Sequence, residues 1–293
     1  MTIEGYQFAR METFSAQGAP GKAAQGPKLR KSGARAWTAT EVFDEAERVP
    51  LACPHVEPGG PPPEIIPGSV NSFAAARSEH AKAAAVRESY VRKGKKAKRK
   101  LRSDAHSLYS SVVSLPTLTA DALADPELRA ECVTLLKDAM AHERKAIVAA
   151  GGVLLMGVIH WDEDHVHAHY LAIQPRKGRI DELHPGRTAK AAFNEAHAAE
   201  KATDPKAVGK GANAAYRAAM RRWQDDFYEA VFDPAGLLRF GPKRLRYTRA
   251  EYKQAMAVKA LVLRGKLSLR VFGAQIVMGV VPSEMASYMR ILE

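Results

Sequence analysis

Cysteine is scarce in this sequence, and long apolar runs and nucleotide-binding fingerprints are missing from it. Cys53 and Cys132 are the two cysteines among 293 residues, which argues against a disulfide framework, leaves room for one bridge at most and favours a reducing cytosol. No run approaches the ~20 apolar residues that span a bilayer, and the first residues lack the charged-then-apolar pattern of a signal peptide. No P-loop or Gly-x-Gly-x-x-Gly motif occurs. We therefore expect a cytoplasmic protein with no membrane segment.

Positive charge is in excess and is concentrated in short clusters. The chain has 44 Lys and Arg against 32 Asp and Glu, a net charge of +12, and such a balance indicates a polyanionic partner, usually nucleic acid. The densest cluster, residues 92–102, places eight cations in eleven positions, and smaller clusters occupy 176–179 and 243–249. A solvated helix face or a flexible tail is the alternative interpretation of the first cluster. The residues expected to contact nucleic acid are Arg92, Lys93, Lys95, Lys96, Lys98, Arg99, Lys100, Arg102, Lys243, Arg244 and Arg246.

Strand and helix patterns are mixed along the chain without a strict alternation. The expected strands lie within residues 1–12, at 107–115 with an end at Pro116, at 153–160 and at 167–174. Asp125 and Pro126 predict the start of a long helix that runs to Gly151. An apolar stripe from Tyr216 to Val231 predicts the buried face of a second helix. The mixture predicts the α+β class, with an antiparallel sheet and helices packed on one of its faces.

Proline-rich and alanine-rich segments predict the structure of residues 53–102. Residues 53–69 are too rich in proline for regular structure. Residues 70–102, rich in Ala, Arg and Lys, are expected to be helical to the end of the basic cluster. We expect one domain over residues 1–255, which contains 53–102 as a linker plus basic helical segment, and a C-terminal helical extension over 256–293.

The most informative segment is His160 to His169, which holds four of the chain's ten histidines and three carboxylates. Apolar strands are expected on both sides, so the segment forms a hairpin. Strand side chains alternate between faces, so His167 and His169 point the same way, and His160 ends the partner strand beside them. Glu163 in the loop can reach them as a fourth ligand or as a base. His165 is expected to be a solvent-exposed loop residue.

Histidine and carboxylate together form a ligand set for a divalent metal. Beside a basic surface, such a site suits phosphodiester chemistry, because the cation can draw charge off a phosphate oxygen. Three histidines are also the ligand set of hydrolytic zinc sites. A helical metalloprotease would show His-Glu-x-x-His, whereas this motif is predicted to lie on strands and a loop. We expect a metal site formed by His160, His167 and His169.

The motif also resembles a known family. His167-Ala168-His169 matches the "HUH" motif of single-strand DNA nucleases. The pattern His160, Asp162, Glu163, His167 and His169 is similar to that of the plasmid mobilisation and recombination family (Mob/Pre, or MOBV relaxases). Segments that also resemble this family are 6–11, 101–116, 223–227 and 236–249, so the resemblance covers residues ~5–255 in pieces.

The resemblance implies a relaxase of HUH-like α+β fold, which binds a hairpin and single strand at a plasmid origin of transfer. Such an enzyme cuts one phosphodiester by nucleophilic attack and stays joined to the 5′ phosphate. His160, His167 and His169 would hold Mn²⁺ or Mg²⁺, Glu163 would complete the shell or activate the nucleophile, and Asp162 would support a histidine. Other transfer proteins are further expected partners.

The nucleophile is where the sequence departs from the family. The better-known branch carries a nucleophilic histidine about fifteen residues beyond the Ala-Arg-Met strand, but residues 23–30 here contain none, and Gln25 cannot form a phosphoramidate. Tyr6, His55 and Tyr109 are the candidate substitutes. Two alternatives follow: a DNA-binding relative that lacks nicking activity, and a metal phosphoesterase that uses activated water.

Overall fold

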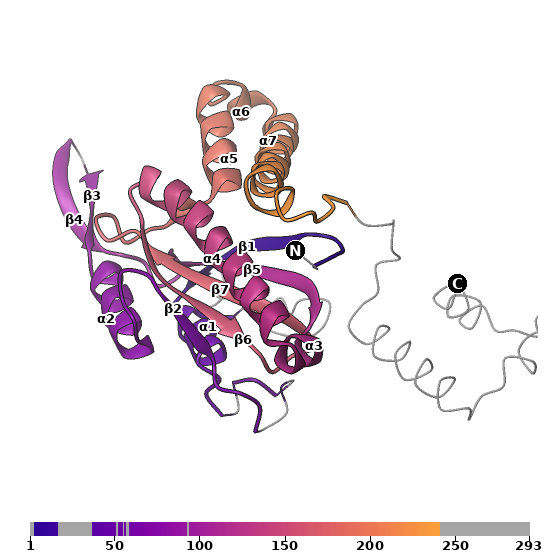
Figure 1. Ribbon diagram of the computed structural model, residues 1–293. Coiled ribbons are helices and arrows are strands. Elements are labelled where there is room, and N and C mark those ends of the chain that lie inside the picture. The colour runs from indigo at the N-terminus through magenta and orange to yellow at the C-terminus, as the bar shows by residue number, and fades with distance from the viewer. Residues whose placement is uncertain are drawn as a thin grey trace, which may run out of the picture. The chain divides into compact units, whose positions relative to one another are not determined.

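In a computed structural model, the described residues are 3–16, 37–50, 52–54, 56, 59–92 and 94–240, without the side chains of 91 and 92. They belong to one compact unit, residues 1–241 (Figure 1). A five-stranded sheet has the order β1-β5-β7-β6-β2, with every neighbouring pair antiparallel. Its strands are β1 Phe8–Ser15, β2 Glu64–Pro67, β5 His106–Leu118, β6 Val153–His160 and β7 His165–Ile173. The predicted α+β class with an antiparallel sheet is confirmed.

Helices cover both faces of this sheet, and not one face as expected. On one face, α4 (Pro126–Ala149), α7 (Pro205–Phe227) and the π-helical turn η3 (Tyr228–Phe232) form a core with Tyr109 and Tyr170. On the other face, α1 (Ala39–Ala46) and α2 (Phe73–Ala84) pack on Leu155, Val158 and Leu171. The shorter elements are α3 Thr119–Ala124, η2 Asp181–Leu183, α5 Pro185–Ala196 and α6 Glu200–Thr203. Helix α2 lies within the segment 70–102 that was predicted to be helical, whereas α1 was not predicted. The expectation of one covered face is wrong because a local pattern does not say which face of a sheet a helix packs against.

The two predicted helices form as their sequence signals indicate. The Asp125 side chain accepts hydrogen bonds from the backbone N–H of Glu127 and Leu128, and Pro126 occupies the first turn of α4, because its missing N–H costs nothing there. In α7 and η3, Trp223 and Val231 of the predicted stripe are buried in the core. Figure 1 shows α4 lying across the sheet.

Two predictions that relied on proline as a strand breaker are wrong. β5 continues past Pro116 to Leu118, with a shift in its pairing with β7 between Ser114 and Leu118. A missing N–H is tolerated at such an irregularity. The proline-rich segment 53–69 is also not wholly irregular, because Glu64–Pro67 forms β2 at the sheet edge, where a terminal proline leaves no inner partner unpaired.

The basic cluster lies on a β-hairpin, and the prediction of a helix to residue 102 is wrong. Helix α2 ends at its C-cap Ala85, and β3 (Arg87–Arg92) pairs antiparallel with β4 (Lys95–Lys100) in a separate two-stranded sheet. Gly94 at the turn has φ +74, a left-handed conformation that glycine adopts without a steric penalty. The alanine-rich part of 70–102 forms helix α2, whereas the part that carries the basic cluster forms the β3–β4 hairpin.

Several predictions fall on residues outside the described part of the chain. These are Lys93, Lys243, Arg244 and Arg246 among the expected nucleic-acid contacts, Gln25 and His55, and the domain division at 255/256. Cys53 and Cys132 are free thiols. None of the described helices is long and apolar enough to cross a membrane.

Candidate metal centre

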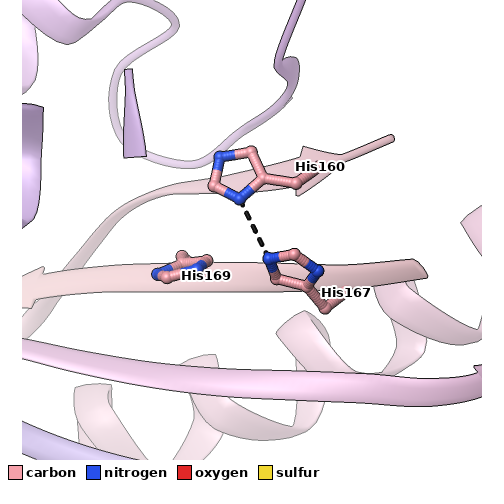
Figure 2. A group of neighbouring side chains, drawn as sticks. All are labelled: His160, His167 and His169. Carbon is pink, nitrogen blue, oxygen red and sulfur yellow. Dashed lines mark hydrogen bonds between the residues drawn. The ribbon is translucent and has the colours of Figure 1, made fainter. Parts of the chain in front are cut away.

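His160, His167 and His169 meet on the face of the sheet that α1 covers. In the antiparallel pairing of β6 with β7, His160 lies opposite His167 and Val158 opposite His169. Figure 2 shows the three imidazoles turned toward one another, with ring centroids 4.9 to 5.4 Å apart. One nitrogen of each ring lies within 4.8 Å of the others. The convergence inferred from strand parity is therefore present in the structure.

All three imidazoles are buried and are held in the neutral form. Their residues are 1%, 7% and 8% exposed, in sequence order. Burial lowers the pKa of His160 to about 3, lowers the pKa of His167 and lowers the pKa of His169 well below its usual value. Neutral imidazole is the form that binds a metal, so no proton has to leave before a cation enters.

The hydrogen bonds of two of these rings leave nitrogen lone pairs facing each other. His160 Nε2 donates to the Ala46 carbonyl at 2.9 Å, and His167 Nδ1 donates to the His165 carbonyl at 3.0 Å. A neutral imidazole has a single N–H, so His160 Nδ1 and His167 Nε2, 3.1 Å apart, both present lone pairs. This tautomer assignment follows from the carbonyl partners.

That arrangement fits a shared cation. Two lone pairs at 3.1 Å repel unless a positive charge lies between them, and the low pKa of His160 disfavours a proton there. Two nitrogens bound to one cation at about 2.1 Å lie roughly 3.0 to 3.4 Å from each other, which agrees with the observed separation. The backbone carbonyls also fix the rings of His160 and His167 in orientations that suit a metal ligand.

Helix α1 contributes a buried carboxylate that the sequence analysis missed. Thr38 caps the helix through a capping box with Glu41, and the helix places Glu45, 8% exposed, beside the histidines. Glu45 Oε2 is 3.7 Å from His169 Nδ1, and burial raises the pKa of Glu45 to about 7. The sequence does hold a signal for this residue: Glu45 lies on the same face of α1 as the buried residues Val42 and Ala46, where an apolar side chain is expected.

Arg48, also missed, connects α1 to the loop of the histidine hairpin. It adopts φ +60, the left-handed region, which a residue with a side chain occupies at a steric cost. Its guanidinium donates to both oxygens of Asp162 at 2.7 Å, to Glu163 Oε1 at 2.8 Å and to Glu45 Oε1 at 3.1 Å. These bonds raise the pKa of Arg48 although burial alone would lower it.

The two loop acids of the motif therefore lie beside the histidines and are bound by Arg48. Glu163 Oε1 is 3.6 Å from His167 Nε2, so its predicted role as ligand or base stays a prediction with suitable placement. Asp162, predicted to support a histidine, accepts hydrogen bonds from Arg48 through both carboxylate oxygens, and its role toward a histidine stays a prediction. His165 is exposed as expected, although it begins β7 and is not a loop residue.

The two described candidate nucleophiles lie in different environments. Tyr109 belongs to the core on the α4 face of the sheet, opposite the histidines, and its hydroxyl donates to Glu143 at 2.8 Å. Burial raises the pKa of Tyr109 well above its usual value. Tyr6 is 37% exposed and precedes β1, where it forms a bridge with Leu238. Tyr109 thus faces away from the cluster, whereas Tyr6 keeps an accessible side chain.

The basic residues of the hairpin are exposed but lie far from the histidines. Lys95, Lys96, Lys98 and Lys100 point to solvent, and Arg99 and Arg102 form exposed ion pairs with Glu88 and Asp104. The hairpin leads into the His106 end of β5, whereas His167 pairs with Ser114 near the other end. Eight residues of strand correspond to about 26 Å. The described part of the basic surface is therefore a separate region from the metal centre.

Comparison with known proteins gives one remote structural likeness. No family model matches the chain, and no curated protein matches its sequence. Among solved structures, the chain is similar to the MobM relaxase domain (MOBV; Mob_Pre) bound to plasmid pMV158 oriT DNA, a Mn-bound crystal structure. The match covers 86% of this chain and 99% of that chain, with 18% sequence identity and a TM-score of 0.45.

Proposed function

We propose that this protein is a metal-dependent relaxase, or a related HUH nicking enzyme, that cuts and rejoins one strand of plasmid DNA at an origin of transfer. The observation that carries the proposal is the buried trio of neutral histidines, two of which turn lone pairs toward each other at 3.1 Å. The motif resemblance and the exposed basic hairpin support DNA as the substrate.

His160, His167 and His169 hold Mn²⁺ or Mg²⁺ in this proposal, and the bound cation supplies charge stabilisation at a non-bridging phosphate oxygen. Glu163 completes the ligand set or accepts the proton of the nucleophile, because it lies 3.6 Å from His167. Arg48 positions Glu163 and Asp162 through its hydrogen bonds.

The proposed reaction is a transesterification without an outside reactant. A side chain of this protein attacks phosphorus, a bond from that side chain to phosphorus forms, and the bond to the 3′ oxygen breaks. The nucleophile's proton goes to a base, and the base returns this proton to the departing 3′ oxygen, which leaves as a hydroxyl. The protein stays joined to the 5′ phosphate until the 3′ hydroxyl attacks in reverse. Of the described candidates, accessible Tyr6 suits this role better than buried Tyr109.

A covalent-adduct assay tests this proposal. The protein is incubated with labelled single-stranded origin DNA and Mn²⁺, denatured, and examined for protein-bound label, with mass spectrometry to locate the nucleophile. We expect an adduct that is lost in His167→Ala and His169→Ala. His165→Ala is the matched control, because it removes an exposed histidine of the same motif. Binding without an adduct would favour the DNA-binding relative, and free cut ends would favour the phosphoesterase.

Metal binding is measured separately from activity. A ligand at about 100 times its Kd stabilises the folded state by about 2.7 kcal/mol, so Mn²⁺ is expected to raise the thermal midpoint of the parent and of His165→Ala. His167→Ala and His169→Ala are expected to lose that shift. An equal shift in all four proteins would place the metal elsewhere and contradict the assignment.

A further inference from the structure

Within the described part of the chain, helices cover only part of the sheet face that carries the histidines. Phe14, near one end of β1, packs against the core formed with α1 and α2. At the other end of the strand, Phe8 is 49% exposed and the Arg10 side chain is 59% exposed. A large aromatic ring and a guanidinium are thus presented to solvent on a strand whose other face contributes Ala9 and Met11 to the opposite core.

Strand register places these two side chains in line with the metal centre. Phe8 pairs with Ser114, Ser114 with His167, and His167 with His160. Directly paired residues of antiparallel strands share a face, so this row runs from the exposed ring to the histidines. The next row joins Arg10 through Val112 to His169. Two strand spacings correspond to about 10 Å.

We infer that Phe8 and Arg10 form a binding site for one unpaired nucleotide that flanks the cut phosphate, with the base stacked on the Phe8 ring and its phosphate held by Arg10. This inference rests on the proposed function. An exposed aromatic beside a cation is the combination with which proteins bind single-stranded nucleic acid. The intervening Ser114 is small, so the path along the row stays open to a strand.

The ion pair between Arg10 and Glu12 allows a second test, in which the two residues have opposite expected effects on DNA affinity. Arg10 binds the Glu12 carboxylate, and both side chains are exposed, by 59% and 39%. Exposed pairs are weak, so a phosphate can replace Glu12, but the acid still competes for the guanidinium. Removal of the Glu12 charge should therefore tighten DNA binding, whereas removal of the Arg10 charge should weaken it.

The test measures binding of a fluorescent, unstructured oligonucleotide of about 12 nucleotides, without divalent metal so that no cutting occurs. Phe8→Ala is expected to raise Kd about 5- to 100-fold, and Phe8→Trp to keep parental affinity. Val148→Ala is the matched control, because Val148 is an exposed apolar residue, 59% exposed, on α4. Glu12→Gln is expected to lower Kd, and Arg10→Gln to raise it and reduce the salt slope by about 0.7.

Two outcomes separate this inference from the proposed function. If the parent forms the covalent adduct and Phe8→Ala binds the oligonucleotide as the parent does, the nucleotide site is refuted and the relaxase proposal stands. If Phe8→Ala binds weakly but the parent forms no adduct, the nucleotide site stands and nicking fails. A parent that does not bind the single strand refutes both. Equal weakening for a duplex of the same sequence, or a fall in the thermal midpoint of Phe8→Ala with unchanged Kd, also overturns the inference.

Discussion

Replacement of Arg48 by alanine should destabilise the fold strongly. The Arg48 side chain is 10% exposed, and its partners Asp162 and Glu45 are 5% and 10% exposed. Loss of one partner from such a buried pair costs about 3 to 5 kcal/mol, because the remaining charge keeps its desolvation penalty. We expect Arg48→Ala to lose stability in that range at pH 8. The loss should be smaller at pH 6, since Glu45, with its pKa raised to about 7, then takes up a proton.

The backbone of Arg48 allows a second comparison at the same position. At φ +60 an L-residue carries a steric cost of about 1 to 2 kcal/mol that glycine avoids. Arg48→Gly should therefore be about 1 kcal/mol more stable than Arg48→Ala, the reverse of the usual order. Urea unfolding followed by circular dichroism measures both differences.

Arg77 is the matched control for this experiment. It also binds two carboxylates of the α1 region, Asp44 and Glu47, but its side chain is 30% exposed. Arg77→Ala is expected to cost about 1 kcal/mol or less. If Arg48→Ala costs no more than Arg77→Ala, the ionic cluster is not a stabilising element. If Arg48→Gly is no more stable than Arg48→Ala, the left-handed conformation is refuted.

Two further predictions concern charge. Burial raises the pKa of Glu143 to about 7, so this group stabilises the folded state fully below its unfolded pKa of 4.5, and that contribution is lost as pH rises through 7. Glu143→Gln should then be more stable than the parent at pH 8, by about 3 kcal/mol, with the advantage gone at about pH 4; an advantage independent of pH in urea titrations would contradict this. On the hairpin, the double change Lys95→Gln and Lys98→Gln should weaken duplex DNA binding and lower the salt slope by about 1.8, or 0.9 for each lost phosphate contact. Lys201→Gln with Lys206→Gln, which removes the same charge from exposed sites near α7, should leave the slope unchanged.

The predictions that held rest on local rules. The start of α4 follows from one capping aspartate and one proline, which act within a single turn. Where two local signals compete, the sequence alone does not predict the secondary structure. Alanine, lysine and arginine all favour helix, so residues 87–100 read as helical, but the turn at Gly94 and the pairing of Arg87 with Lys100 produce a hairpin. The extent of β5 beyond Pro116 likewise depends on the strand beside it.

The histidine cluster marks the boundary between sequence and tertiary structure. Period-two alternation and a short loop placed His160, His167 and His169 on one face, because all three belong to one hairpin and no distant contact is needed to align them. Glu45 and Arg48 lie beside the same cluster but are 114 or more residues away in the chain from the groups of the histidine hairpin that they meet. Only the packing of α1 on the sheet brings them there, and no local spacing encodes that packing. The sequence by itself thus determined that the three histidines converge on one face of the sheet, and the tertiary structure decided which buried charges surround them.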